Sequence, residues 1–178
     1  MKKGETMGSE AVSATVDRLA LELVHRCARM VTAESCTGGG VAVALTDRVG
    51  SSAWFECGYV TYSNAAKQRD LGVPEALIRE HGAVSVEVAG AMAEGAARRA
   101  GCAYAVAISG IAGPGGATPG KPVGTVCFGF YLEGRLIGER HHFDGDRDAV
   151  RSAAVRHTLD RLLELIESAG ASSDSSSR

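Results

Sequence analysis

Helical patterns alternate with short apolar segments along this chain, and this alternation limits the folds that it can adopt. The most informative segment is 102–109 (CAYAVAIS), a nearly continuous apolar run. Strands of this kind are buried on both faces, as in sheets that carry helices on each side. An alanine-rich helical pattern over 85–99 precedes this run, and the glycine-rich stretch 110–120 follows it. This order predicts an α/β fold built in layers.

Four further segments have the β-branched and aromatic composition of strands. These predicted strands cover residues 30–33, 54–62, 123–132 and 135–143. Glu133 and Gly134 suit a hairpin turn between the last two strands, which makes the sheet mixed. A helical pattern covers 41–46, and the other helices are expected to begin near the capping residues Ser9, Ser63 or Asn64, Pro74, Ser85 and Asp146.

We therefore expect a single-domain three-layer α/β/α sandwich with a mixed, mostly parallel sheet. The domain is predicted over residues 9–168, a length at which one hydrophobic core is sufficient. Residues 1–8 are polar and residues 169–178 are rich in serine, so both segments are expected to be flexible tails.

Composition argues against several classes of protein. The net charge is −2 and aromatic residues make up 5% of the chain, which argues against nucleic-acid binding. No apolar run approaches the ~20 residues of a membrane span and no signal peptide is apparent, so we expect a cytoplasmic protein without membrane association. The five cysteines lack CxxC spacing and nearby histidines, which predicts neither a disulfide framework nor a zinc site.

The glycine-rich loop at 34–40 (ESCTGGG) offers the first candidate nucleophile. It follows a predicted strand and precedes a helix, so Ser35 would project where the amides of a helix N-terminus converge. Ser35 could instead cap the helix, but Thr37 is at least as good a cap and leaves Ser35 available. Cys36 is the rival nucleophile, and no histidine lies near it in the sequence. We prefer Ser35, with the amides of Gly38–Gly39 binding the oxyanion.

A serine nucleophile needs a base, and surface or core positions explain the five histidines better than catalysis does. Lys67 falls in the first turn of a predicted helix, where the helix dipole and partial burial lower the pKa of an ammonium. It could take the Ser35 proton directly or through the Tyr62 hydroxyl. A solvated surface lysine explains the position equally well. The chain has 4 lysines against 15 arginines, and a coding bias accounts for the arginines.

The second glycine-rich loop, from Ser109 to Thr125, contains six glycines and three prolines. A loop of this length inside a compact domain is typically functional. Lys121 could meet a phosphate there, although a solvated loop tip explains it better. Arg147, at the start of the last predicted helix, could clamp a phosphate with two hydrogen bonds or pair with a neighbouring aspartate.

Six motifs follow one another in the order and spacing of a known family. They are TAESCTGG (32–39), GSSAWFECGYVTYSNAAK (50–67), HGAVS (81–85), ISGIAGPGG (108–116), KPVGTV (121–126) and GDRDAVR (145–151). On these motifs the chain resembles the CinA C-terminal domain family over about residues 10–168. The resemblance implies an α/β/α sandwich and a serine–lysine amidase that needs neither a metal nor another cofactor. It also implies deamidation of nicotinamide mononucleotide to nicotinic acid mononucleotide and ammonia, in pyridine-nucleotide salvage.

The resemblance implies roles for individual residues. Ser35 corresponds to the nucleophile, Lys67 to the general base and Tyr62 to an assisting hydroxyl. We assign the substrate phosphate to Arg147. The small nucleotide substrate is the expected partner molecule, and family likeness favours a homo-oligomer, a dimer or larger. The residues that enclose the substrate in the family correspond to Thr37, Gly38, Gly39, Ser109, Gly110 and Thr125.

Two other functions fit the same sequence. One is a nucleotide-binding module without turnover, linked to competence or to the response to DNA damage. Such a module would keep the glycine loops without requiring Ser35, Tyr62 and Lys67 together. The other is an amidase for a different small amide. Longer CinA proteins carry an N-terminal molybdopterin-binding-like domain with pyrophosphatase activity, which we do not expect here.

Overall fold

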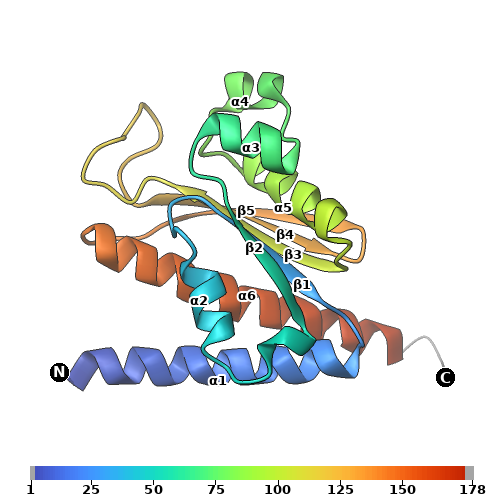
Figure 1. Cartoon of the computed structure of the whole chain (residues 1–178). Helices are drawn as coiled ribbons and strands as arrows, with labels where there is room; N and C mark the ends of the chain where they lie inside the picture. The colour runs from blue at the N-terminus through green and yellow to red at the C-terminus, as the bar shows by residue number, and fades with distance from the viewer. Residues whose placement is uncertain (1–2, 175–178) are drawn as a thin grey trace.

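A five-stranded sheet forms the centre of the molecule, and helices cover both of its faces (Figure 1). The computed structural model describes residues 3–174, with side chains over residues 10–169. The strands are β1 (Met30–Glu34), β2 (Phe55–Val60), β3 (Tyr104–Gly110), β4 (Thr125–Leu132) and β5 (Arg135–His142). The helices are α1 (Lys3–His25), α2 (Gly40–Thr46), α3 (Asn64–Leu71), α4 (Glu75–His81), α5 (Val86–Ala100) and α6 (Arg147–Asp174), with a short 3-10 turn at Ser51–Ala53.

The sheet is mixed, as the sequence predicts. Its strand order is β2-β1-β3-β4-β5. Strand β1 pairs in parallel with β2 and β3, whereas β4 runs antiparallel to both β3 and β5. It follows that β5 runs in the same direction as the first three strands and that β4 alone is reversed. Glu133 and Gly134 form the turn between β4 and β5, and both have the positive φ that a two-residue type I′ hairpin turn requires.

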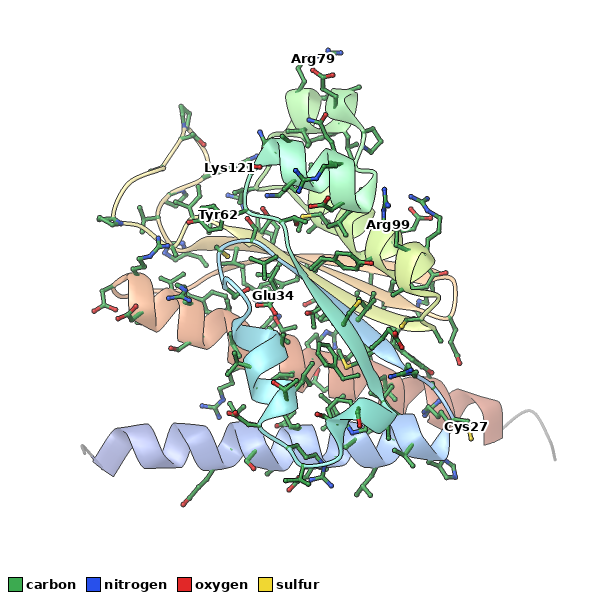
Figure 2. All side chains as sticks on the ribbon, viewed as in Figure 1. Cys27, Glu34, Tyr62, Arg79, Arg99 and Lys121 are labelled. Carbon is green, nitrogen blue, oxygen red and sulfur yellow. The ribbon has the colours of Figure 1, made fainter. Side chains whose placement is uncertain are left out.

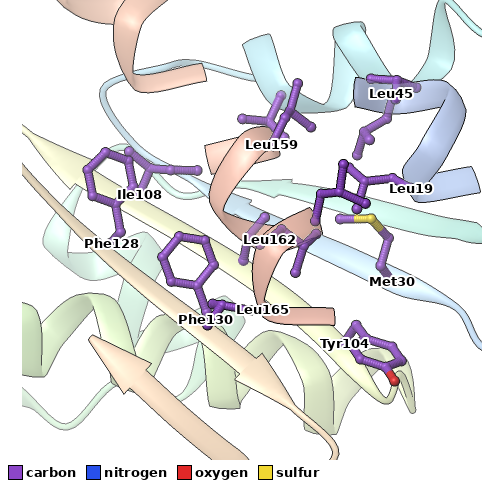
Figure 3. Close-up of a cluster of buried hydrophobic side chains, with 14 of the residues drawn as sticks. Leu19, Met30, Leu45, Tyr104, Ile108, Phe128, Phe130, Leu159, Leu162 and Leu165 are labelled. Carbon is purple, nitrogen blue, oxygen red and sulfur yellow. The ribbon is translucent and has the colours of Figure 1, made fainter. Parts of the chain in front are cut away.

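Helices α1, α2 and α6 pack on one face of the sheet and α3, α4 and α5 lie on the other, which confirms the three-layer sandwich (Figure 1). Buried side chains such as Phe128, Phe130 and Leu162 fill the space between the sheet and α6 (Figure 3). On the opposite face small residues let α5 approach the strands closely. A Cβ added at Gly129 would lie 2.3 Å from the Ala89 carbonyl oxygen.

Capping contacts confirm most of the predicted helix starts. Ser63, Ser85 and Asp146 each accept a hydrogen bond from a backbone amide in the first turn of the helix that follows. The prediction for Ser9 is wrong, because α1 already begins at Lys3 and Ser9 lies inside it. The helical pattern of the apolar positions after Ser9 continues upstream through polar residues, which carry no periodic signal of their own.

Helices α1 and α6 extend into the segments 1–8 and 169–178, for which we expected tails, because α1 begins at Lys3 and α6 ends at Asp174. The two helices pack against each other. None of the helices in the described range combines the length and the apolar character that crossing a lipid bilayer requires.

The carboxyl ends of β1, β2 and β3 meet at one edge of the sheet. In the strand registers, Glu34 lies beside both Val60 and Ile108. Three loops leave the sheet at this edge, formed by residues 35–39, 61–63 and 111–124. Ligands of open α/β sheets bind at this position. The fold therefore brings together the loops that carry most of the predicted site residues.

Candidate active site

Lys67 lies in the first turn of α3 and is buried, with 1% of the residue exposed. Its Nζ lies 3.1 Å from the Oγ of Ser35, which is the residue that directly follows β1. The same nitrogen lies 2.9 Å from the carbonyl oxygen of Thr61 and 3.2 Å from that of Tyr62. Helix α3 begins at Asn64, after the N-cap Ser63, so its first turn carries the lysine back over the end of β1. Because Lys67 is buried, the alternative interpretation of this residue as a solvated surface lysine is wrong.

As an ammonium, Lys67 can donate one N–H to each of its three oxygen partners. Carbonyl oxygens only accept, so Thr61 and Tyr62 each take one N–H. A neutral amine has two N–H groups, and both are then occupied, which leaves its lone pair for Ser35. In this form the Ser35 hydroxyl donates to Nζ. The geometry is therefore that of a serine whose proton has an acceptor already in contact.

Burial lowers the pKa of Lys67 below its ordinary value, because a desolvated site disfavours the charged ammonium. The nearby Cys36 thiol raises the pKa of Lys67, but this effect is smaller than that of burial. The hydrogen-bond partners of the Lys67 Nζ among the described residues are two carbonyl oxygens and a hydroxyl, and no carboxylate pairs with it. The sequence predicts the direction of the shift, and the structure attributes it to burial.

Glu34, the last residue of β1, is fully buried and was not among the predicted site residues. Its carboxylate accepts hydrogen bonds from the amides of Gly39 and Val41 at 3.1 Å and of Ala42 at 2.9 Å. It also accepts one from the Thr37 hydroxyl at 2.7 Å. A carboxylate at this place satisfies the free amides of the α2 N-terminus and complements the helix dipole.

The expectation that Thr37 caps α2 is therefore wrong. Gly39 occupies the N-cap position without a side chain, and the Thr37 hydroxyl donates to Glu34 instead of accepting from the helix. A signal for Glu34 was present in the sequence, because an acidic residue stands shortly before a glycine-rich turn and a helix.

The amides available to an oxyanion also differ from the expected ones. The Gly39 amide donates to the buried carboxylate, and the Gly38 amide donates to the Ser35 carbonyl oxygen at 3.0 Å. Within the described part of the chain, the amides of Cys36 and Thr37 donate to no other residue, and the Cys36 amide lies against its own thiol. These two amides directly follow Ser35. In the α/β-hydrolases, the N–H of the residue after the nucleophilic serine binds the oxyanion.

Cys36 is buried and packs against Gly110 at the end of β3. A Cβ added at Gly110 would lie 3.0 Å from Cys36 Sγ and 3.0 Å from the Thr125 carbonyl oxygen, so this position leaves no room for a side chain. Burial raises the pKa of the Cys36 thiol to about 11. A thiol that stays protonated near neutral pH is a poor nucleophile, which favours Ser35.

Ser109 and Thr125 mark the two ends of the second glycine-rich loop, and both are buried. The Ser109 hydroxyl donates to the Ala83 carbonyl oxygen at 2.7 Å. The Thr125 carbonyl oxygen accepts from the Ile111 amide at 2.8 Å. These bonds hold the loop ends at the sheet edge, where Gly110 contacts the Ser35 turn.

Tyr62 and Arg147 lie at the surface, and Tyr62 is 62% exposed. Arg147 donates to the Gly113 carbonyl oxygen at 2.9 Å and to the Tyr62 hydroxyl at 3.3 Å. Asp148 lies 4.0 Å from Arg151, and Arg147 forms no ion pair within the described residues. The aspartate pairing considered for Arg147 is thus absent. The Tyr62 hydroxyl contacts Arg147, whereas Lys67 Nζ contacts Ser35 Oγ directly.

Lys121 is not a solvated loop tip. Its Nζ donates to the His81 carbonyl oxygen at 2.6 Å, which ties the second glycine-rich loop to the end of α4. Figure 2 shows Lys121 and Tyr62 on the side of the molecule where this loop lies.

Comparisons with known proteins agree with the motifs and with the fold. The profile of the CinA C-terminal domain matches residues 12–166. The chain belongs to the CinA C-terminal domain family. Within this family it is similar to nicotinamide-nucleotide amidohydrolase PncC of Pseudomonas putida, with 53% identity over 156 residues, 88% of this chain and 98% of that protein.

A second relative of the same name comes from Escherichia coli K12 and is 55% identical over 141 residues, 79% of this chain and 86% of that protein. Among solved structures, a CinA superfamily protein from Klebsiella pneumoniae matches with a TM-score of 0.84 and 38% identity. That match covers 88% of this chain and 98% of the Klebsiella chain. The sequence motifs and the fold thus agree with one family.

Proposed function

We propose that this protein is an amidohydrolase that converts nicotinamide mononucleotide to nicotinic acid mononucleotide and ammonia, as a step of pyridine-nucleotide salvage. The observation that carries the proposal is the buried contact of 3.1 Å between Lys67 Nζ and Ser35 Oγ. The substrate class is taken from the PncC relatives at 53% and 55% identity. A nucleotide-binding module without turnover would have no use for a lysine buried against a serine.

In the first half of the reaction, Ser35 Oγ attacks the carboxamide carbon while its proton passes to Lys67 Nζ. The carbonyl oxygen takes the negative charge and is bound by the amides of Cys36 and Thr37. The carbon–nitrogen bond then breaks as the Lys67 ammonium gives its proton to the leaving nitrogen. Ammonia departs, and Ser35 carries the acyl group as an ester.

In the second half, water hydrolyses this ester. Neutral Lys67 takes a proton from the water as its oxygen attacks the ester carbon. When the tetrahedral species collapses, the proton returns to Ser35 Oγ and the carboxylic acid of the product is released. The lysine is neutral again and can accept the Ser35 proton in the next cycle.

Arg147 is placed to bind the substrate phosphate. Its guanidinium has two neutral partners, the Gly113 carbonyl oxygen and the Tyr62 hydroxyl. A phosphate in their place would form charge-assisted and bidentate hydrogen bonds, which are the stronger kind. Tyr62 would then border the nucleotide. A contact distant from the reacting carbon orients the substrate and contributes proximity.

The test is ammonia release by the purified chain from nicotinamide mononucleotide, nicotinamide riboside, nicotinamide and simple aliphatic amides. We expect the highest kcat/KM on the mononucleotide, with a loss of at least about tenfold on the riboside, which lacks the phosphate. Preference for an amide without a nucleotide would point to the other amidase function. No turnover on any compound, together with nucleotide binding, would support the binding module.

A further inference from the structure

Two histidines and a glutamate converge between β5 and α6, in a place that the proposed reaction does not use. Within the described residues, one ligand atom from each of Glu139, His141 and His157 lies within 4.8 Å of the others. Glu139 and His141 are two apart on β5 and so share a face of the strand. His157 comes from α6, which packs against that part of the sheet.

We propose that Glu139, His141 and His157 form a binding site for one divalent transition-metal ion of the Zn²⁺ type, which would join β5 to α6. Two imidazole nitrogens and one carboxylate oxygen are a common ligand set for such ions. The proposal is independent of the proposed amidase function. His157 lies ten residues beyond Arg147 on α6, about 15 Å along the helix axis.

Distances within the group fit a metal better than they fit simple hydrogen bonds. The carboxylate oxygen Oε2 of Glu139 lies 3.3 Å from His141 Nε2 and 3.4 Å from His157 Nε2. Charge-assisted hydrogen bonds to a carboxylate are usually ~2.7–2.9 Å long. Two ligands that bind a tetrahedral Zn²⁺ at ~2.0–2.1 Å are separated by about 3.3–3.4 Å. Both ring nitrogens therefore lie at ligand spacing from one oxygen.

The surroundings orient the three ligands. Arg161 Nε donates to the other carboxylate oxygen of Glu139 at 2.7 Å, which fixes the carboxylate and leaves Oε2 toward the histidines. The rings of His141 and His157 are 4.1 Å apart between centroids, and Phe128 lies 4.7 Å from His157. An outer hydrogen bond to a ligand and an apolar wall are features that tune metal sites.

Direct binding of Zn²⁺ tests this proposal. The protein is the untagged full chain, treated with a chelator and carrying Cys27→Ser, because Cys27 is an exposed thiol that could bind the metal itself. Titration calorimetry should show one Zn²⁺ bound per chain. His141→Phe, which keeps the ring packing, and Glu139→Gln should each weaken binding at least about tenfold.

His142→Phe is the matched control. It is the neighbouring residue on β5, and its ring faces Asp144 at 3.4 Å, so its replacement should leave binding unchanged. Zn²⁺ should also raise the melting temperature of the Cys27→Ser parent and of the His142→Phe variant, but not of His141→Phe. Circular dichroism of each metal-free variant checks its fold. Absence of binding by the parent, or equal binding by His141→Phe and His142→Phe, would overturn the proposal.

Discussion

Among the single residues of the site, Lys67 has a proposed role, acceptance of a proton, that an arginine could not take. Its side chain is buried against two carbonyl oxygens and a serine, and the serine can donate to the amine only when the amine is neutral. Arginine keeps its proton in proteins. Arginine carries most of the positive charge of this chain. Position 67 nevertheless holds a lysine, because an arginine there could not accept a proton.

Replacing Lys67 by Arg should abolish most ammonia release. The guanidinium keeps the positive charge but cannot accept the Ser35 proton, and loss of a general base costs about 10²–10⁴-fold in rate. The measurement is kcat for the mononucleotide, with a thermal melt to confirm folding. Lys121→Arg is the matched control, since Lys121 only donates to a carbonyl oxygen. Activity of Lys67→Arg within tenfold of the parent would contradict the role of base.

The rate should rise with pH. The pKa of Lys67 is lowered by burial, so the neutral, active form is populated at lower pH than for a free lysine. We expect kcat/KM to increase with pH and to level off after an inflection below 10.5, the ordinary value. Cys36→Ala should leave the inflection in place, because the thiol with a pKa of about 11 stays protonated. A rate that falls with rising pH would argue against a lysine base.

Among the elements, the short helix α2 depends on a residue outside itself. Glu34 at the end of β1 accepts three of the first amide hydrogen bonds, so the strand end, the Ser35 turn and the helix are held by one carboxylate. The Gly39 amide is one of these three donors, so it is not available to an oxyanion in the proposed reaction. In the described part of the chain, the turn leaves the amides of Cys36 and Thr37 without a partner in another residue.

Glu34→Gln should destabilise the fold by about 1–3 kcal/mol, because the new amide group turns a donor toward donors in a buried place. Chemical denaturation measures the loss, and ammonia release should fall as well because the Ser35 turn loosens. Glu56→Gln removes a partly exposed carboxylate that pairs with Arg29, and it should cost at most about 1 kcal/mol. Equal stability of Glu34→Gln and the parent would show that the carboxylate does not hold the turn.

Strands, helices and their order were predictable because each has a strong local pattern. The apolar run ending at Ser109 and the caps at Ser63 and Ser85 are examples. The burial and the hydrogen-bond partners of individual groups were not predictable. Whether Lys67 is solvated or buried depends on where α3 starts relative to β1, and which amides remain free depends on the position of the Glu34 carboxylate. Both depend on the tertiary structure and not on a local sequence pattern.

The whole molecule has two hydrophobic cores, one on each face of the central sheet. The core between the sheet and α1, α2 and α6 contains Trp54, the single tryptophan of the chain, at 2% exposure. The core on the other face is formed largely by α5. Because β1 and β3 contribute side chains to both cores, loss of one layer should expose the other. The homo-oligomer and the domain limits 9–168 stay predictions.

Unfolding should therefore be a single cooperative transition. Denaturation followed by the fluorescence of Trp54 reports on one layer, whereas far-ultraviolet circular dichroism reports on the helices of both layers. The two curves should share one midpoint and one slope, as expected of a domain of this size. Separate midpoints would mean that the two layers unfold independently and that the molecule is not one cooperative unit.

The proposed nucleophile is Ser35, activated by Lys67, and ammonia release by Ser35→Ala beside Cys36→Ala tests this role most directly. We predict that Ser35→Ala loses turnover of nicotinamide mononucleotide by about 10⁴-fold or more while it still binds the nucleotide, as expected when a catalytic serine is removed. Cys36→Ala should keep its activity within a few-fold. Turnover by Ser35→Ala within tenfold of the parent, or its loss in Cys36→Ala alone, would contradict the account.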